Sequence, residues 1–284
     1  MAIEKVGVIG AGTMGNGIAQ VCALKGIAVT MVDINDAAVQ KGIATVSGSL
    51  DRLIKKGTLS AADKDAALAR IRGTTVLADV RDTDIVIEAA TENLAVKLKL
   101  LQDTDAILKS GSIIASNTSS ISITRLAAAT KRADKFIGMH FFNPVPLMAL
   151  VELISGLQTS DATRAAVGEL AKRLGKTPIQ VKNHPGFVVN RLLIPMINEA
   201  AFALQEGLAT AQEIDDGMKL GCNHPIGPLA LADLIGLDTV LSVMNVFYEG
   251  FNDSKYRPAP LLKEMVDAGF LGRKSRRGFY SYNK

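Results

Sequence analysis

The sequence predicts an α/β fold, in which a doubly wound, mostly parallel sheet with a helical insertion is followed by an all-α C-terminal domain. Short apolar runs of strand length alternate with helical stretches over about the first 184 residues. The first run leads into a glycine-rich turn, and only helical patterns occur after residue 184. Continuous apolar strands between helices are typical of a parallel sheet covered on both faces.

Apolar runs and the helical stretches between them define the elements of the first part. The longest helical stretch predicts a hairpin of two helices that breaks near residues 57–60, with Ser60 capping the second helix. The predicted helices are 13–26, 35–70 and 94–108, and the predicted strands are 6–9, 27–32, 84–88, 112–116, 136–140, 151–154 and 178–181.

The pattern changes between Asn183 and Gly186, which predicts two domains, 1–184 and 185–284. Helices are expected at about 187–206, 210–220, 228–249 and 258–268. Apolar residues recur at helical spacing in the first of these helices, so one of its faces needs a partner surface. They are Phe187, Leu192, Leu193, Ile197, Ala201 and Leu204.

Composition excludes several classes of protein. Hydrophobic residues make up 48% of the 284 residues and charged residues 21%, as in ordinary globular proteins. The net charge of +4 is scattered, and without tryptophan or interleaved aromatic residues it gives no support to nucleic-acid binding. No signal peptide or membrane-spanning stretch is evident, and Cys22 and Cys222 lie in no metal-ligand spacing. We therefore expect a cytoplasmic protein without a metal, whose positive charge suits an anionic small substrate.

A dinucleotide-binding motif opens the chain. The segment from Gly10 to Gly15 matches G-x-G-x-x-G between the first strand and the first helix, and Asp33 ends the second strand. This pattern predicts a Rossmann-type site for NAD, because the Asp33 carboxylate can accept hydrogen bonds from the ribose but would repel the 2′-phosphate of NADP. The predicted contacts to the dinucleotide are Gly10, Ala11, Gly12, Thr13, Met14, Gly15 and Asp33.

Candidate catalytic residues follow two later strands. His140 ends a strand, and ligands bind at the carboxyl ends of strands in this architecture. Histidine is the most frequent general base near neutral pH. Asn117 to Ser120 follow the strand 112–116, while Glu152 lies among apolar residues, where a buried acid needs a partner such as an imidazolium. His184 and His224 precede prolines in loops and are interpreted as surface or boundary residues.

Several segments together resemble the short-chain (S)-3-hydroxyacyl-CoA dehydrogenases of the 3-hydroxybutyryl-CoA dehydrogenase type, over essentially the whole chain. The most specific segments are His140-Phe141-Phe142-Asn143-Pro144 and Pro185-Gly186-Phe187-Val188-Val189-Asn190-Arg191. The others are 8–15, 116–120 and Gly278-Phe279-Tyr280. The family tail often has a glycine where this chain has Arg276, a departure that bears on the local turn and on the role of Lys274.

The resemblance implies roles for individual residues. His140 would be the general acid/base and Glu152 its orienting carboxylate, while Ser119 and Asn190 would hold the 3-oxygen and the neighbouring carbonyl of the substrate. Ser49 and Lys56 would contact CoA. Contacts on the nicotinamide side would come from Glu92, Lys97, Asn117, Ser119, Asn143 and Lys274.

The implied reaction is NAD-dependent interconversion of (S)-3-hydroxybutyryl-CoA and acetoacetyl-CoA, within fatty-acid metabolism. The resemblance also implies a homodimer formed by the second domain, with the active site between the domains. Two other functions stay open. One is NAD-dependent oxidation of a free hydroxy acid or sugar acid, as in the similar lambda-crystallin-type gulonate dehydrogenases; the other is a non-catalytic, NAD-binding structural protein.

Overall fold

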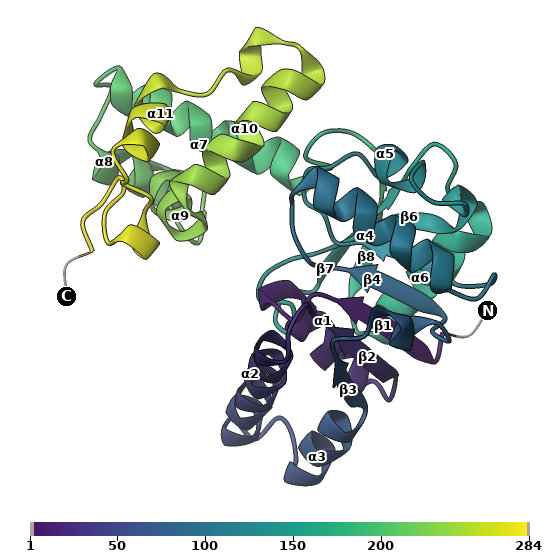
Figure 1. Ribbon diagram of the computed structural model, residues 1–284. Coiled ribbons are helices and arrows are strands. Elements are labelled where there is room, and N and C mark those ends of the chain that lie inside the picture. The colour runs from purple at the N-terminus through teal and green to yellow at the C-terminus, as the bar shows by residue number, and fades with distance from the viewer. Residues whose placement is uncertain (1–2, 283–284) are drawn as a thin grey trace. The chain divides into compact units, whose positions relative to one another are not determined.

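The computed structural model describes residues 3–282, and the chain divides into two compact units, Met1–His184 and Pro185–Lys284. The first unit is built around an eight-stranded sheet of order β3-β2-β1-β4-β5-β6-β7-β8 (Figure 1). Within this order, β1 lies between β2 and β4, so the direction of winding reverses there. In doubly wound sheets, ligands bind outside the carboxyl ends of the strands at such a reversal.

All neighbouring strands pair in parallel except β6 and β7, which are antiparallel. The predicted mostly parallel sheet is therefore confirmed. The strands are β1 Lys5–Ile9, β2 Ala28–Val32, β3 Ile71–Thr74, β4 Ile85–Glu88, β5 Ile113–Ser116, β6 Phe136–Phe141, β7 Leu150–Ser155 and β8 Thr177–Lys182.

Helices cover both faces of this sheet. Helices α1 (Thr13–Leu24) and α6 (Asp161–Arg173) bury apolar side chains against one face, together with part of α2 (Asp36–Lys55). Helices α4 (Leu94–Ile107) and α5 (Ile123–Ala127) lie on the other face (Figure 1). Cys22 of α1 lies in the core beneath α1 and α6, where burial raises the pKa of its thiol to about 12, so it is an inert core residue.

Short polar side chains fix where most of these helices begin. Each of them accepts a hydrogen bond from the backbone of the first turn and so satisfies one N–H group that the helix leaves without a partner. Ser60 caps α3 (Ala61–Ala69) by accepting from Asp63 N, which confirms the predicted break of the helical hairpin. The other capping residues of this unit are Asn35, Asn93, Ser122 and Ser160.

The second unit is helical, with α7 (Val189–Gln205), α8 (Ala211–Asp216), α9 (Pro228–Ile235), α10 (Leu237–Phe251) and α11 (Pro260–Asp267). The prediction of one helix over 228–249 is wrong, because Gly236 adopts a φ of 104° and separates α9 from α10. The helix expected over 210–220 is α-helical only to Asp216 and continues as a π-helical turn.

Two buried aspartates fasten the C-terminal tail to this unit. Asp215 Oδ2 accepts the hydroxyl of Tyr280 at 2.7 Å, and the Asp215 carboxylate also accepts the N–H groups of Leu229 and Ala230. Asp233 accepts the N–H groups of Phe279 and Tyr280. Burial and the Asp215 carboxylate both raise the pKa of Tyr280, so its hydroxyl stays protonated and keeps donating.

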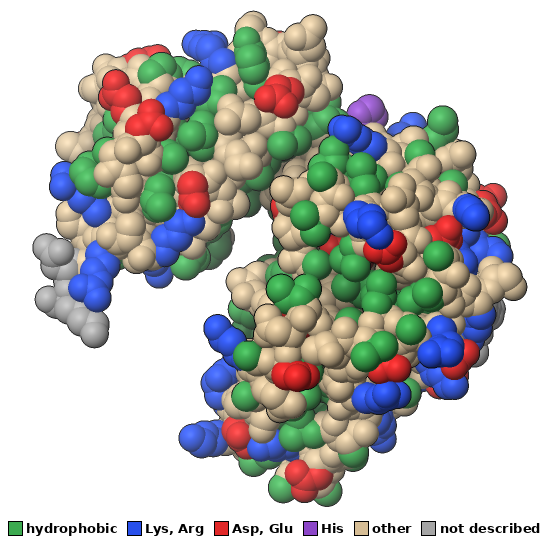
Figure 2. All heavy atoms as spheres, in the orientation of Figure 1, with side chains coloured by type: hydrophobic (Ala, Val, Ile, Leu, Met, Phe, Trp, Pro, Cys, Tyr) green, Lys and Arg blue, Asp and Glu red, His purple; other side chains and the backbone are tan. Residues whose placement is uncertain are grey.

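Among the strands and α-helices of the first unit, three were not predicted: the edge strand β3 and the helices α5 and α6. Among the described residues, no single helix is long and apolar enough to cross a membrane. Helices α9 and α10 reach that length and apolar composition only when they are taken together, and they are bent by 98° relative to each other. Lysine and arginine side chains are interspersed with acidic ones on the face of each unit seen in Figure 2, in line with the scattered charge of the sequence.

Candidate active site

The glycine turn after β1 has the geometry that a dinucleotide needs. Gly10 adopts a φ of 101°, and a Cβ there would lie 2.6 Å from Ala89 O; a Cβ on Gly15 would lie 1.7 Å from Gly10 O. A Cβ on Gly12 would meet nothing within 4 Å, and no side chain caps α1. Packing therefore explains Gly10 and Gly15, whereas Gly12 and the first N–H groups of α1 leave room for an anionic ligand.

Asp33 holds the turn from the end of β2. Its Oδ2 accepts the N–H of Ala11 at 2.7 Å, and its Oδ1 accepts the N–H of Ile34 at 2.7 Å. The carboxylate is half-buried and still lines the adjoining pocket. Of the predicted dinucleotide contacts, Ala11, Gly12, Thr13 and Asp33 line this pocket, while Met14 packs partly against the core.

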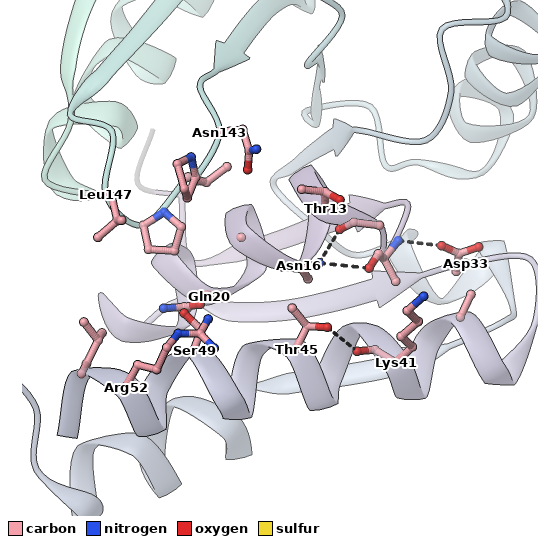
Figure 3. A pocket seen from close by; sticks show the side chains of 18 of the residues that line it. Thr13, Asn16, Gln20, Asp33, Lys41, Thr45, Ser49, Arg52, Asn143 and Leu147 are labelled. Atoms are coloured by element: carbon pink, nitrogen blue, oxygen red, sulfur yellow. Dashed lines mark hydrogen bonds between the residues drawn. The ribbon is translucent and has the colours of Figure 1, made fainter. Parts of the chain in front are cut away.

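A pocket of about 670 Å³ lies between the glycine turn, α2 and the segment from Asn143 to Leu147 (Figure 3). Donor side chains at helical spacing line it along one stripe of α2 and at its C-cap residue, Lys56. These residues are Lys41, Thr45, Ser49, Arg52 and Lys56. The structure thus brings Ser49, Lys56 and Asn143, predicted for CoA and for the nicotinamide, into one pocket with Asp33.

His140 and Glu152 face each other across the antiparallel pair. They are direct register partners on β6 and β7, and His140 Nδ1 lies 2.7 Å from Glu152 Oε2. Both side chains are buried, and the His140 ring lies 4.6 Å from the ring of Phe142, centroid to centroid. The sequence-based expectation that Glu152 is a buried acid beside an imidazole agrees with this geometry.

The segment after β5 is held to its neighbours by side-chain hydrogen bonds. Asn117 Oδ1 accepts the N–H of Phe141 at 2.8 Å, which ties this segment to the strand that carries His140. Glu92 accepts the Thr118 hydroxyl at 2.8 Å and the N–H of Ser119 at 3.0 Å. Asn117 and Glu92 were predicted to contact the nicotinamide; the structure shows that they also fix Ser119 near the carboxyl end of β6.

Lys97, another predicted nicotinamide contact, is buried in α4. Its Nζ lies 2.5 Å from Glu88 Oε2, and Glu88 also accepts the Ser116 hydroxyl at 2.7 Å and the N–H of Ala90 at 2.9 Å. A buried ammonium needs such a partner. The contacts of Lys97 that the structure describes therefore lie inside the protein, and its role toward a cofactor stays a prediction.

The second unit carries two predicted site residues. Asn190 is half-buried at the start of α7. Lys274 forms an ion pair with Asp238 at 2.5 Å, in a 3₁₀ turn over Arg273–Ser275. Arg276 follows with a φ of 61°, so the turn keeps the left-handed conformation that glycine favours, although this chain places arginine there.

Some residues of the site were missed in the sequence. The pocket is also lined by Lys41, Arg52 and Gln20. Lys41 and Arg52 could have been found from the sequence, because positions 41, 45, 49, 52 and 56 have the spacing of one helix face. Lys176 was also missed: its buried Nζ donates to the carbonyls of Val145, at 2.5 Å, and Met148, at 2.8 Å, and so fixes the wall of the pocket. Burial lowers the pKa of Lys176.

The sheet order, the glycine turn and the acid after β2 define a Rossmann-type dinucleotide-binding protein. Family profiles identify the branch of that class. Residues 5–184 match "3-hydroxyacyl-CoA dehydrogenase, NAD binding domain", and residues 186–282 match "3-hydroxyacyl-CoA dehydrogenase, C-terminal domain". The chain belongs to the 3-hydroxyacyl-CoA dehydrogenase family, which confirms the resemblance drawn from the sequence and NAD as the cofactor of the first domain.

Similar proteins cover the whole length of the chain. The 3-hydroxybutyryl-CoA dehydrogenase of Bradyrhizobium diazoefficiens is 54% identical over 280 residues, 99% of this chain and 96% of the relative. The crystal structure of the (S)-3-hydroxybutyryl-CoA dehydrogenase of Ralstonia eutropha is 69% identical, with a TM-score of 0.98 and 100% of both chains covered. A diketoreductase that acts on dicarbonyl compounds is 31% identical, with a TM-score of 0.87, over 99% of this chain and 100% of the other.

Proposed function

We propose that the protein is an NAD-dependent dehydrogenase that interconverts (S)-3-hydroxybutyryl-CoA and acetoacetyl-CoA. The buried pair of His140 and Glu152 supports this most directly, because it is an acid/base pair at the carboxyl edge of a dinucleotide-binding sheet. Relatives named for this reaction, 54% and 69% identical, support the same conclusion.

In the proposed oxidation, His140 takes the proton of the 3-hydroxyl group on Nε2, the ring nitrogen opposite Nδ1. NAD, when bound at the glycine turn, would supply the acceptor for the hydride that leaves C3. The Glu152 carboxylate, 2.7 Å from Nδ1, orients the ring and stabilises the imidazolium that forms. In the reverse direction the imidazolium returns the proton to the 3-oxo oxygen. Acid–base catalysis of this kind contributes about 10²–10⁴-fold to the rate.

Ser119 and Asn190 complete the proposed substrate site. Their side chains donate hydrogen bonds to the 3-oxygen and the thioester carbonyl, and these bonds strengthen as negative charge develops on oxygen. Glu92 and Asn117 fix the position of Ser119, since one accepts its N–H and the other ties its segment to β6. Glu92, Lys97, Asn117, Asn143 and Lys274 remain the proposed residues around the nicotinamide.

The pocket along α2 is the proposed site for the charged end of CoA. Ser49 and Lys56 line it beside Arg52 and Lys41, whereas Asp33 is the only acid among its described lining residues. Lys41, Arg52 and Lys56 form no ion pair with any acidic side chain among the described residues. A row of cations facing a pocket favours a substrate that carries phosphates over a free hydroxy acid.

The alternative of a dehydrogenase for small free acids or ketones is favoured by one observation: the 31% identical diketoreductase shares the fold over the full chain. Initial rates of NADH oxidation with acetoacetyl-CoA and with free acetoacetate separate the two functions. We expect kcat/KM to be at least about 100-fold higher for acetoacetyl-CoA, because only CoA places phosphates beside the cations. Equal values, or a preference for acetoacetate, would overturn the proposal. NADPH serves as the cofactor control and should support little activity.

We also propose that the protein is a homodimer formed by the second unit. Leu192 of α7 is 71% exposed, whereas Ile197 and Ala201 of the same helix are buried within the unit. The apolar residues that recur at helical spacing along α7 are therefore only partly buried by the unit itself. A second copy of the chain would cover the apolar side chains that stay exposed.

A further inference from the structure

Gln20 of α1 is a buried polar side chain whose Nε2 atom has no hydrogen-bond partner among residues 3–282. It is 1% exposed, and its Nε2 forms no hydrogen bond in the part of the chain that the structure describes. Natural proteins satisfy nearly all buried donors, since an unmade hydrogen bond in a dry site costs free energy. A donor left without a partner in this way is explained when a ligand supplies the acceptor.

The position of Gln20 identifies the ligand's chemistry. Its side chain lies in the wall of the α2 pocket, grouped with Ser49 and Arg52 at the end away from Asp33 (Figure 3). The exposed cations Arg52 and Lys56 belong to the same pocket, and Asp33 is the only acid among its described lining residues. An acceptor that enters between cations and an amide donor is anionic, and a phosphate oxygen fits all three.

The dinucleotide does not account for this donor. Its predicted contacts, Gly12, Thr13 and Asp33, lie at the turn after β1 and at the end of β2, while Gln20 lies two helical turns further along α1. The remaining part of the pocket is the one that we assigned to CoA. The inference below therefore rests on the proposed function.

We propose that the Gln20 carboxamide donates a hydrogen bond from Nε2 to a phosphate oxygen of the acyl-CoA. Gln20 is then a specificity residue that distinguishes CoA thioesters from substrates without phosphates. A site built around such a donor discriminates against ligands that leave it unpaired. The cost of the unpaired donor in the free protein is offset when the substrate binds.

If Gln20 has this role, replacing it should change stability and acyl-CoA binding in opposite directions, which a purely structural residue would not do. Replacing Gln20 with methionine, an apolar side chain of similar length, removes the unpaired donor. The free protein should become more stable, while acyl-CoA binding becomes weaker. A glutamine that served only the fold would lose stability on the same substitution and leave binding unchanged.

The test uses Gln20→Met in the full chain, with Gln40→Met as the matched control. Gln40 is an exposed residue of α2 that does not line the pocket. For Gln20→Met we expect a higher urea midpoint and a KM for acetoacetyl-CoA raised about ten-fold, because hydrogen bonds to charged groups are the strong ones. We expect kcat to be nearly unchanged, since the lost contact is uniform binding. Calorimetric titration with free CoA should show the same loss of affinity.

Two further substrates locate the contact. The KM for acetoacetyl-N-acetylcysteamine, which has no phosphate, should be the same in Gln20→Met and in the unmutated protein. The KM for NADH should also be unchanged, and a rise confined to NADH would assign the donor to the cofactor and overturn the proposal. A lower urea midpoint in Gln20→Met, or an unchanged KM for acetoacetyl-CoA, would overturn it as well. If the unmutated protein neither binds CoA nor reduces acetoacetyl-CoA, the proposed function itself is wrong.

Discussion

At the scale of single residues, the proposed reaction depends on the buried pair of His140 and Glu152, in which the imidazole carries the proton and the carboxylate orients the ring. A histidine at a strand end and an acid among apolar residues were both visible in the sequence. Their separation of 2.7 Å was not, because it depends on how β6 and β7 align. Gln20 could not be recognised as a site residue from the sequence, since only the structure shows that its Nε2 atom has no hydrogen-bond partner in the described part of the chain.

Replacing His140 with glutamine should test the proposed base directly. Glutamine keeps a polar side chain but cannot take a proton at neutral pH, so we expect kcat to fall by about 10²–10⁴-fold. The dissociation constant of NADH, measured by fluorescence, should stay within about two-fold, because the glycine turn is untouched. The control is His224→Gln, a half-buried histidine of the second unit, which should keep normal turnover. Near-normal turnover of His140→Gln would remove His140 as the base.

Arg276 offers a second test at this scale. Its φ of 61° costs an L-residue about 1–2 kcal/mol. Its N–H donates to the carbonyl of Arg273, and its own carbonyl accepts the N–H of Tyr282. Arg276→Gly should therefore raise the free energy of unfolding by about 1 kcal/mol, as measured by urea denaturation. Arg276→Ala, which keeps the Cβ atom, should leave it within about 0.5 kcal/mol of the original value. A glycine variant no more stable than the alanine variant would contradict this explanation.

At the scale of elements, the strongly apolar strands and the helices α1 to α4 were predicted from the sequence, whereas several elements with weaker patterns were missed. Strand β3 contains an exposed arginine and Gly73, and it pairs only with β2 at the edge of the sheet. The split of α9 and α10 was missed because the apolar pattern continues across Gly236. Helix α6 was identifiable in principle, since Ser160 caps it and apolar residues follow at helical spacing.

The start of β1 is held by a carboxylate whose charge makes the contact sensitive to pH. Asp84 Oδ2 accepts the N–H groups of Glu4 and Lys5, each at 2.9 Å, and Oδ1 lies 2.8 Å from Lys109 Nζ. Burial by itself would raise the pKa of Asp84, but these hydrogen bonds outweigh it and lower the pKa below its usual value of 3.8. The stabilising contribution is therefore complete above the unfolded-state pKa and is lost as the pH falls through the folded-state pKa.

Asp84→Asn should remove this pH-dependent contribution. At pH 7 we expect the variant to be less stable by about 1 kcal/mol, because an ion pair with one exposed partner contributes little and the N–H groups keep a neutral acceptor. The difference between the two proteins should shrink as the pH falls through the lowered folded-state pKa of Asp84, because the carboxylate of the original protein then becomes protonated. Urea denaturation at several pH values measures it. A deficit of constant size from pH 7 to pH 2.5 would show that geometry, not charge, is responsible.

At the scale of the whole molecule, the two units contribute different parts of the proposed function. The first unit carries the glycine turn, the acid/base pair and the pocket along α2. The second carries Asn190 and the exposed apolar side of α7. The family profiles match the two units separately, over 5–184 and 186–282.

The proposed dimer is tested by Leu192→Arg. Burying one leucine is worth about 1.5–3 kcal/mol, and a twofold interface counts it twice, so the charged variant should dissociate at concentrations where the original protein stays dimeric. Sedimentation velocity over a dilution series measures this. Leu157→Arg is the control, because Leu157 is 88% exposed but lies in the first unit. An unmutated protein that sediments as a monomer, or equal effects of both substitutions, would contradict the proposal.

The pairing of β6 with β7 also limits how this enzyme can change during evolution. Because His140 and Glu152 meet as register partners, inserting one residue inside β7 ahead of Glu152 would turn its carboxylate to the opposite side of the sheet. The same insertion in the connection between the two strands, such as beside Leu147, would leave the partners aligned. We therefore expect natural homologues to keep the separation between Leu150 and Glu152 constant.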